Sequence, residues 1–485
     1  MRLGYFTMPL HPAHRPPAIT LQEDREAIIL ADRLGFYDAF VGEHLTEPSE
    51  NVTNSFIFLA TLIHHTQNIK LATGTSNLSH SHPTLIAAHA AMFDHLAQGR
   101  FIFGVSPGAL PSDAEALGML GEDRNKLFAE AIDVILAIWE RDAPYDIDLP
   151  GNRFKVSTAQ TQNPEIGRGG MYKPWQQPRP EIVGTVVAPG SKGVIAMGER
   201  DFHPLSANFL LSQYLASHWS NYAEGKKRVG QTPDPADWRI ARTIFVADDE
   251  HTAERYALQD SASPYRHYWE LLLKKMLISK RHAIFKTHPE QDDRELTTDY
   301  MVDQLVLCGT PNRVAEEILA LREEAGEFGE IVYAGMDWVD PALAKRYDAK
   351  LVPFFLQPLI DKPALVQADH IHPTAPGVEL LVAATLEATL LQPANPYAVT
   401  KAAAVIVLPE IDEMLSQAPV QPAYARVVCK HPYLLYARIA QWFDWARQPA
   451  REISVHPFPD VEPVSIQAGS AEHVEHAPIV VEPPF

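Results

Sequence analysis

The first 355 residues alternate short apolar runs with helical patterns, and this alternation constrains the fold more than any other feature of the sequence. Apolar runs of strand length lie at 3–7, 38–41, 69–73, 101–105, 181–187, 205–209, 238–247 and 328–334. Segments with helical spacing follow most of them, including 21–34, 55–65, 124–140, 311–325 and 341–350. Strands that alternate with helices are typical of parallel sheets. We therefore predict an α/β protein built as a (β/α)8 TIM barrel, with an open doubly wound sheet as the alternative.

Two segments interrupt the alternation. Residues 142–179 contain Asp, Pro, Gly and Gln without a period, and residues 262–300 are polar and helix-prone. We interpret both as insertions and expect the second to form a lid. No Gly-x-Gly-x-x-Gly follows the first strand, which disfavours a dinucleotide-binding sheet.

The composition changes after residue 356, where proline is frequent and Gly377 and Gly469 are the only glycines. We predict a barrel domain at 1–356 and a C-terminal extension of unclear function at 357–485. The extension is expected to be mostly helical or poorly ordered, with helices at 378–392, 400–416 and 423–447 and little order from 452 onward.

The formal net charge of −20 argues against nucleic acid or an anionic membrane as a partner. The two cysteines, Cys308 and Cys429, fit a reducing compartment. No apolar run approaches the ~18 residues of a membrane span, and the N-terminus does not resemble a signal peptide. We expect a cytoplasmic protein. His80 and His82 have no acidic residues clustered near them, so we expect no metal site.

Several candidate site residues follow the predicted strands, where barrels place their chemistry. His44 follows the second strand and can act near neutral pH as a base or a hydrogen-bond donor. Gly74 follows the third strand and allows close packing against a ring, while Thr75 or Asn77 can bond to a polar ring edge.

The fourth strand runs into a loop rich in glycine and proline. Gly108 and Pro107 let this backbone approach a flat ligand closely, because Gly108 has no side chain and the ring of Pro107 fixes its φ angle. From the residues alone, the loop indicates a ligand site in an α/β protein.

Three segments, 40–46, 74–83 and 99–113, occur in an order and spacing that resemble the bacterial luciferase-like flavin monooxygenases, especially their limonene-monooxygenase-like branch. Residues 238–247 and 308–338 also resemble segments of that family. The resemblance covers about residues 1–356. It implies a TIM barrel that binds reduced FMN supplied by a separate flavin reductase. In such enzymes O2 adds to the flavin C4a, and the resulting peroxide oxygenates an organic substrate.

The same resemblance implies roles for individual residues. His44 matches the family's catalytic histidine, which assists proton transfer and holds the peroxyflavin. Gly74 and Thr75 match the backbone that packs on the isoalloxazine, often through an unusual peptide geometry. The segment from Val105 to Gly108 matches the loop beside the flavin.

The expected phosphate site departs from the family pattern. After the fifth strand the family reads Ser-Pro-Ser/Thr-Gly, whereas this chain reads Ala-Pro-Gly-Ser-Lys-Gly at 188–193. Gly190, Ser191 and Gly193 still offer N–H groups at a helix start, and Lys192 adds a positive charge.

Other functions remain open from the sequence. The same barrel also fits a deazaflavin-dependent hydride-transfer enzyme or a degenerate, non-catalytic barrel. In the extension, Asp369 with His372 resembles part of an esterase site, and Tyr397 with Lys401 resembles part of a dehydrogenase site. Each lacks its partner motif, so we expect neither activity. For the monooxygenase we expect a small hydrophobic substrate, a pocket lined by both insertions, and a homodimer.

Overall fold

The computed structural model describes residues 1–7 and 10–336. Several predictions lie outside these residues. They are the helix at 341–350, the boundary at 356, the extension with its three helices and its end from 452, Cys429, and the pairs Asp369 with His372 and Tyr397 with Lys401.

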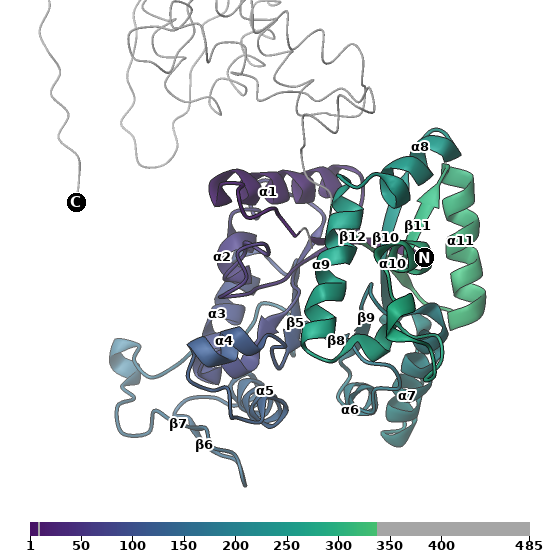
Figure 1. The fold of residues 1–485 in the computed structure, drawn as a ribbon. Coiled ribbons are helices and arrows are strands. Elements are labelled where there is room, and N and C mark those ends of the chain that lie inside the picture. Colours follow the sequence, from purple (N-terminus) through teal and green to yellow (C-terminus); the bar gives the residue numbers. More distant parts are fainter. Residues whose placement is uncertain (8–9, 337–485) are drawn as a thin grey trace, which may run out of the picture. The chain divides into compact units, whose positions relative to one another are not determined.

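Parallel strands close into a barrel (Figure 1). In chain order they are β1 (Arg2–Thr7), β2 (Asp38–Val41), β3 (Lys70–Thr73), β5 (Phe101–Ser106), β8 (Glu181–Val186), β9 (His203–Ser206), β10 (Arg239–Val246) and β12 (Glu330–Gly335). Each strand pairs with the next, and β12 pairs with both β10 and β1, so the sheet closes on itself. The predicted (β/α)8 barrel is confirmed.

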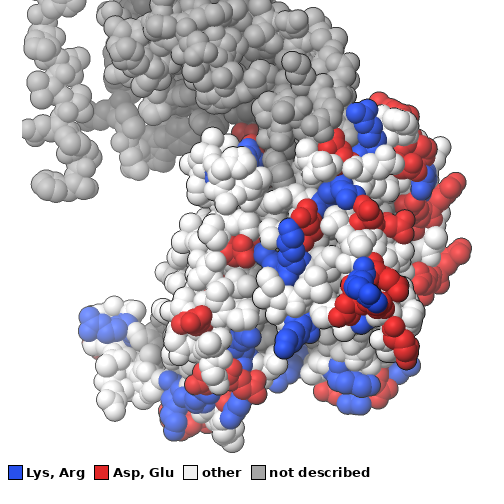
Figure 2. Space-filling model, in the orientation of Figure 1, with Lys and Arg blue, Asp and Glu red and all other residues white. Residues whose placement is uncertain are grey.

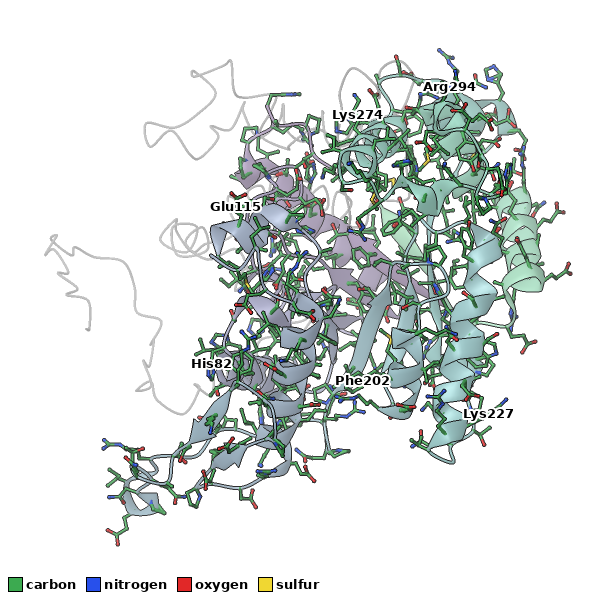
Figure 3. The ribbon with its side chains drawn as sticks, turned by 60° about the horizontal axis from the view of Figure 1, so that its bottom comes forward. His82, Glu115, Phe202, Lys227, Lys274 and Arg294 are labelled. Atoms are coloured by element: carbon green, nitrogen blue, oxygen red, sulfur yellow. The ribbon has the colours of Figure 1, made fainter. Side chains whose placement is uncertain are left out.

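Other strands extend or decorate the barrel. The two-residue strand β4 (Ser76–Asn77) pairs with β5, and β11 (Val306–Gly309) pairs with β10. Inside the insertion at 142–179, β6 (Asp146–Asp148) and β7 (Lys155–Ser157) form an antiparallel hairpin. This insertion extends away from the barrel in both Figure 1 and Figure 3.

Helices follow the strands and begin where capping residues predict. Asp123 accepts hydrogen bonds from the backbone N–H groups that open α5, and Thr310 caps α11 in the same way. The helices are α1 (Pro17–Arg33), α2 (Ser55–Ala60), α3 (Pro83–Leu96), α4 (Pro111–Ala116), α5 (Arg124–Glu140), α6 (Gly193–Glu199), α7 (Leu215–Arg228), α8 (Glu250–Glu254), α9 (Pro264–Ile278), α10 (Thr298–Leu305) and α11 (Pro311–Ala325). None of the helices within 1–7 and 10–336 is long and apolar enough to cross a membrane.

Several predicted boundaries are wrong. The helix predicted at 21–34 begins at Pro17, because proline is favoured at the first position of a helix. The helix predicted at 55–65 ends at Ala60, because the next residues form turns in which the hydroxyls of Thr61 and Thr66 bond to backbone carbonyls. The strand predicted at 205–209 is His203–Ser206, because His203 already pairs with β8 and the chain leaves the sheet after Ser206.

The barrel interior is built in layers, because residues two apart on a strand point to the same side of the sheet. One apolar layer takes a residue from each barrel strand: Phe6, Phe40, Ala72, Ile102, Val183, Leu205, Ala241 and Val332. On several strands, the residue two positions before this apolar layer is charged. The residues two positions after it are mostly small.

The charged layer closes the amino-terminal end of the barrel around Arg239, whose side chain is 0% exposed. Its Nε lies 3.1 Å from Asp38 Oδ2 and 3.3 Å from Glu330 Oε2, and its Nη1 lies 2.7 Å from Glu181 Oε1. Burial and the charge of Glu330 raise the pKa of Asp38 well above its ordinary value, while Arg239 opposes this shift. A Cβ atom at Gly4 would lie 2.4 Å from oxygens of both Asp38 and Glu330, so only glycine leaves room there.

Replacing Arg239 with Met should destabilise the fold by about 3–5 kcal/mol, because buried carboxylates lose their counter-charge. Urea unfolding followed by circular dichroism measures the change. Arg200 is the matched control, since it pairs with Asp133 at 2.7 Å while its side chain is 40% exposed. Arg200→Met should lower the free energy of unfolding by no more than about 1 kcal/mol. Equal effects of the two variants would contradict the role given to Arg239.

Candidate active site

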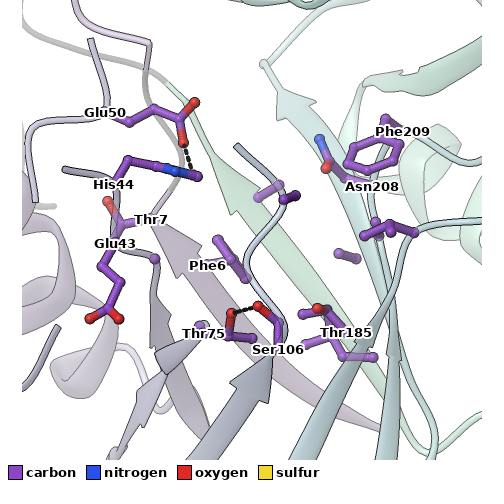
Figure 4. A pocket seen from close by; sticks show the side chains of 18 of the residues that line it. Phe6, Thr7, Glu43, His44, Glu50, Thr75, Ser106, Thr185, Asn208 and Phe209 are labelled. Atoms are coloured by element: carbon purple, nitrogen blue, oxygen red, sulfur yellow. Dashed lines mark hydrogen bonds and ion pairs between the residues drawn. The ribbon is translucent and has the colours of Figure 1, made fainter. Parts of the chain in front are cut away.

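A pocket of about 250 Å³ opens at the carboxyl ends of the barrel strands (Figure 4). Its floor includes the small residues that follow the apolar layer, namely Gly42, Gly74, Thr185, Ala207 and Ala334. Small side chains at these positions leave space above the apolar layer. The amino-terminal end of the barrel is thus filled by the charged cluster around Arg239, and the carboxyl-terminal end holds the pocket.

His44 lies three residues beyond the end of β2 and lines this pocket. Its Nε2 is 3.1 Å from Glu50 Oε2, and its Nδ1 is 3.4 Å from Asp113 Oδ2. Burial alone would lower the pKa of His44, but the hydrogen bond and charge of Glu50, together with Asp113, raise this pKa to about 9. The imidazole is therefore positively charged at neutral pH. Of the two roles predicted for His44, this geometry favours the hydrogen-bond or proton donor over the base.

The carboxylates around His44 are themselves held in place. Asp113 accepts hydrogen bonds from Leu45 N, Thr46 N and Thr46 Oγ1 at 3.2, 2.8 and 2.6 Å, which ties α4 to the loop after β2. Burial would raise the pKa of Asp113, but these bonds lower it below the ordinary value. The carboxylate therefore stays charged beside the imidazole.

Glu50 links His44 to α9. Lys275 of α9 places its Nζ 3.4 Å from Glu50 Oε1 and 2.9 Å from Glu47 Oε2. Burial would raise the pKa of Glu50, but His44 and Lys275 together lower it. Sequence reasoning missed Glu50 and Lys275. The available signal was the pair of acidic residues, Glu47 and Glu50, shortly after His44, but nothing in the sequence places Lys275 beside them.

The ends of β2, β3 and β5, together with β4, form a polar wall in which the side chains bond to one another. Thr75 Oγ1 donates to Ser106 Oγ at 2.6 Å, and Ser106 Oγ donates to Asn77 Oδ1 at 2.8 Å. Asn77 donates through Nδ2 to the Glu43 carbonyl at 3.1 Å and through its backbone N–H to Glu43 Oε1 at 3.0 Å. The wall is therefore held rigid by its own hydrogen bonds.

Gly74 and Thr75 lie where the sequence indicated, at the end of β3 and in the pocket. The peptide bond between them is cis, which is an unusual geometry of the kind that the family resemblance implied. A Cβ atom at Gly74 would lie 2.7 Å from Phe40 Cβ and 3.0 Å from Val41 N. This close approach between β2 and β3 explains the glycine.

The loop after β5 contributes less to the pocket than the sequence suggested. Ser106 and Ala109 line it, whereas Val105, Pro107 and Gly108 do not. The side chain of Val105 packs outward into the core between barrel and helices, because alternate strand residues face opposite sides. Pro107 accepts a hydrogen bond from Ser79 Oγ, and Gly108 packs against His80 with φ +77. Gly108 therefore allows close packing, but on a histidine side chain.

The predicted phosphate loop also lies outside the pocket lining, which reaches only Val187 beside it. Within this loop the Gly190 N–H donates to Ser217 Oγ at 3.2 Å, and the Ser191 carbonyl accepts from Asn221 at 2.8 Å. Lys192 and Gly193 are exposed at the start of α6.

The other half of the pocket is mainly apolar and comes from later parts of the chain. Val187, Phe209, Leu272 and Met276 line it, with Arg281 at its edge. Leu272 and Met276 belong to α9, so the prediction that the insertion at 262–300 lines the pocket is confirmed. The same prediction for 142–179 is wrong for this pocket, because that hairpin extends away from the barrel.

The protein has a closed parallel barrel, and its pocket, with a charged histidine, lies at the carboxyl ends of the strands. These features together define a (β/α)8-barrel enzyme. Sequence comparison specifies the family, since the family model described as luciferase-like monooxygenase matches residues 1–327. The chain belongs to the luciferase-like monooxygenase family, as its motifs predicted, and is an oxidoreductase.

Named relatives are monooxygenases. The chain is 30% identical over 349 residues to 4-hydroxyprotoasukamycin monooxygenase of Streptomyces nodosus subsp. asukaensis, spanning 71% of this chain and 88% of that enzyme. It is 29% identical over 342 residues to limonene 1,2-monooxygenase of Rhodococcus erythropolis, spanning 70% and 82%.

Solved structures share the fold. The oxygenating constituent of 3,6-diketocamphane monooxygenase of Pseudomonas putida, in complex with FMN, has a TM-score of 0.64 and 25% identity, covering 72% of this chain and 95% of that one. An F420-dependent secondary alcohol dehydrogenase has a TM-score of 0.50 and 18% identity, covering 72% and 97%, which shows the fold alone.

A different enzyme matches a smaller share of the chain. UDP-3-O-acylglucosamine N-acyltransferase of Bordetella petrii is 44% identical over 132 residues, which is 26% of this chain and 36% of that enzyme. The chain therefore spans about a third of that relative, too little to show its family.

Replacing Glu50 with Gln should lower the pKa of His44 from about 9 toward its ordinary value of 6.5, because burial then opposes the charged ring with less compensation. Charged His44 stabilises the fold fully below pH 6.5, and this contribution is lost as the pH rises through about 9. In Glu50→Gln this contribution should be smaller, and its loss should be complete at a lower pH.

Imidazole NMR signals followed against pH give this pKa, with His44→Gln identifying the resonance. Glu115→Gln is the control, because Glu115 shares α4 with Asp113 but is exposed (Figure 3). An unchanged pKa of His44 in Glu50→Gln would contradict the assignment.

Replacing Gly74 with Ala should destabilise the protein by about 1–3 kcal/mol, because the added methyl group overlaps Phe40 and the backbone of Val41. Gly121→Ala is the control, since a Cβ atom there meets nothing within 4 Å, and it should change stability by less than about 0.5 kcal/mol. Chemical denaturation measures both variants. Equal stability of the two would show that β2 and β3 tolerate a wider separation.

Proposed function

We propose that this enzyme is an FMN-dependent monooxygenase that uses reduced flavin and O2 to oxygenate a small hydrophobic organic substrate. The observation that carries the proposal is His44, held by Glu50 and Asp113 in a pocket that also has a rigid polar wall and an apolar half. Family membership, the names of the relatives and the FMN complex of the diketocamphane enzyme support it.

Residues of the pocket fit a flavin. Gly42 and Gly74 provide a surface without side chains on which a flat ring can lie, next to the polar wall. Thr7 Oγ1 is buried in the pocket and has no hydrogen-bond partner among residues 1–7 and 10–336, which indicates a polar ligand atom. Reduced flavin supplies the electrons with which O2 is activated.

We assign the cofactor contacts as the sequence predicted. The backbone of Gly74 and Thr75 packs on the ring, with Asn77 at its polar edge. The loop from Val105 through Pro107 to Gly108 supports the ring from behind the lining residues.

For the phosphate we assign the loop after β8. Ser191 and Gly193 offer backbone N–H groups, the Gly190 N–H would have to exchange Ser217 Oγ for the phosphate, and the exposed Lys192 adds the positive charge that an anionic group needs. The loop begins directly after Val187, which lines the pocket.

His44 serves as the proton donor in this proposal. Glu50 and Asp113 keep the ring charged and fix its orientation, so that it can stabilise negative charge and donate a proton in the pocket. Leu272 and Met276 of α9 exclude water from the same space.

We also propose the partners and location that the sequence predicted: O2, a separate flavin reductase, a second copy of the chain and the cytoplasm. The homodimer interface is assigned to α2 and α3. Their exposed apolar side chains are Ile57, Leu85, Met92 and Leu96. The reductase supplies the reduced flavin.

For the C-terminal extension, residues 357–485, we propose a piece of acyltransferase-like sequence without the whole enzyme's activity. The 132-residue acyltransferase match has nearly the length of this extension and covers 36% of that relative. In the sequence, the extension follows the barrel domain proposed at 1–356.

Anaerobic titration with photoreduced FMN tests the cofactor. We expect saturable binding to wild type and to His44→Asn, because His44 acts after binding. Turnover with O2 and a panel of cyclic terpenes should fall by about 10²–10⁴-fold in His44→Asn. Glu115→Gln should keep both properties.

Three outcomes would overturn the proposal. Binding of reduced F420 without FMN would favour the deazaflavin hydride-transfer enzyme, whose solved member shares the fold. Binding of neither cofactor would favour a non-catalytic barrel. Unchanged turnover in His44→Asn would remove the role given to this histidine.

A further inference from the structure

We propose that Asn208 is a specificity-determining residue that selects substrates with a hydroxyl or N–H group on an otherwise apolar body. The inference rests on the proposed function and adds the class of substrate to it. It starts from one polar side chain in the apolar half of the pocket.

Asn208 lies two residues after the end of β9, and it is 2% exposed. Its pocket neighbours Val187, Phe209, Leu272 and Met276 are apolar. In Figure 4 it lies across the pocket from His44 and Thr75. A ligand bound to the polar wall therefore does not occupy Asn208, which can contact a second molecule bound in the apolar half.

Two buried hydroxyl groups fix the amide of Asn208. Its Nδ2 donates to Tyr268 Oη at 3.3 Å and to Thr243 Oγ1 at 3.4 Å, and both partners are buried. Both bonds use the amide nitrogen. No described residue donates a hydrogen bond to Asn208 Oδ1. This oxygen is an acceptor available to the pocket.

An unpaired acceptor in a buried site destabilises the complex with a purely apolar ligand, because the acceptor loses its hydrogen bonds to water and gains none in return. A ligand hydroxyl or N–H removes this penalty by donating to Oδ1. A ligand carbonyl does not, because it places two acceptors together. The amide thus discriminates among molecules of similar shape by the presence of a donor.

The polar groups on the opposite side of the pocket are assigned to the flavin. Thr75, Asn77 and Ser106 bond to one another in the polar wall. No described residue bonds to Thr7 Oγ1, but in Figure 4 Thr7 lies beside His44 and Glu43, on the side assigned to the flavin. Among these groups, Asn208 is therefore the one that we assign to the substrate.

The test uses the FMN-loaded full chain and two probes of nearly equal shape, phenol and toluene. Dissociation constants for both are measured by calorimetry in wild type and in Asn208→Leu. The ratio of the two constants should shift about 2- to 10-fold toward toluene in Asn208→Leu, as expected for the loss of one hydrogen bond. Asn208→Asp keeps an acceptor oxygen and should keep the wild-type ratio.

Glu115→Gln is the control, because Glu115 is exposed on α4 and does not line the pocket, and it should leave the ratio unchanged. An equal ratio in wild type and Asn208→Leu would overturn the assignment. Weaker FMN binding in Asn208→Leu would place the residue in the cofactor site instead. The two proposals fail separately. If the wild-type protein does not bind FMN when it is loaded, before phenol or toluene is added, the proposed function is contradicted.

Discussion

One guanidinium group, that of Arg239, holds the amino-terminal end of the barrel together. It contacts carboxylates from β2, β8 and β12 while belonging to β10, so four strands from distant parts of the chain meet at one charge. Of β2, β8 and β12, only β12 is a neighbour of β10 in the sheet. This interaction therefore acts across the barrel axis, where backbone hydrogen bonds do not reach. With that end closed, the opposite end can be built from small residues and remain hollow.

Much of the barrel was predictable, because strand and helix signals are local. The range of β2 and the ranges of α5 and α11 agree with the prediction, and His44, Gly74, Thr75 and Asn77 all line the pocket. The Arg239 cluster was not predictable, because it depends on the register among strands up to about 290 residues apart in sequence. Val105 was assigned to the flavin loop without regard to the period of two that turns its side chain outward.

The surroundings of His44 show the same limit. The histidine and its position are local facts, but its charge is set by Glu50 from the same loop, Asp113 from α4 and, through Glu50, Lys275 from α9. The sequence therefore indicated a residue able to donate or accept a proton, and the contacts decide between the two. The face shown in Figure 2 carries both signs of charge, so the net charge of −20 does not describe every part of the surface.

The two halves of the pocket come from different stretches of the chain. Most of the polar half is formed by residues between Thr7 and Ala109, and most of the apolar half by residues between Thr185 and Arg281. Mutations in the later stretch can therefore accumulate without disturbing the hydrogen-bonded wall in the earlier one. Under the proposed function, such a division lets natural selection exchange one substrate for another while the chemistry of the other half is inherited, and it makes the segment around α9 the natural unit for grafting between relatives.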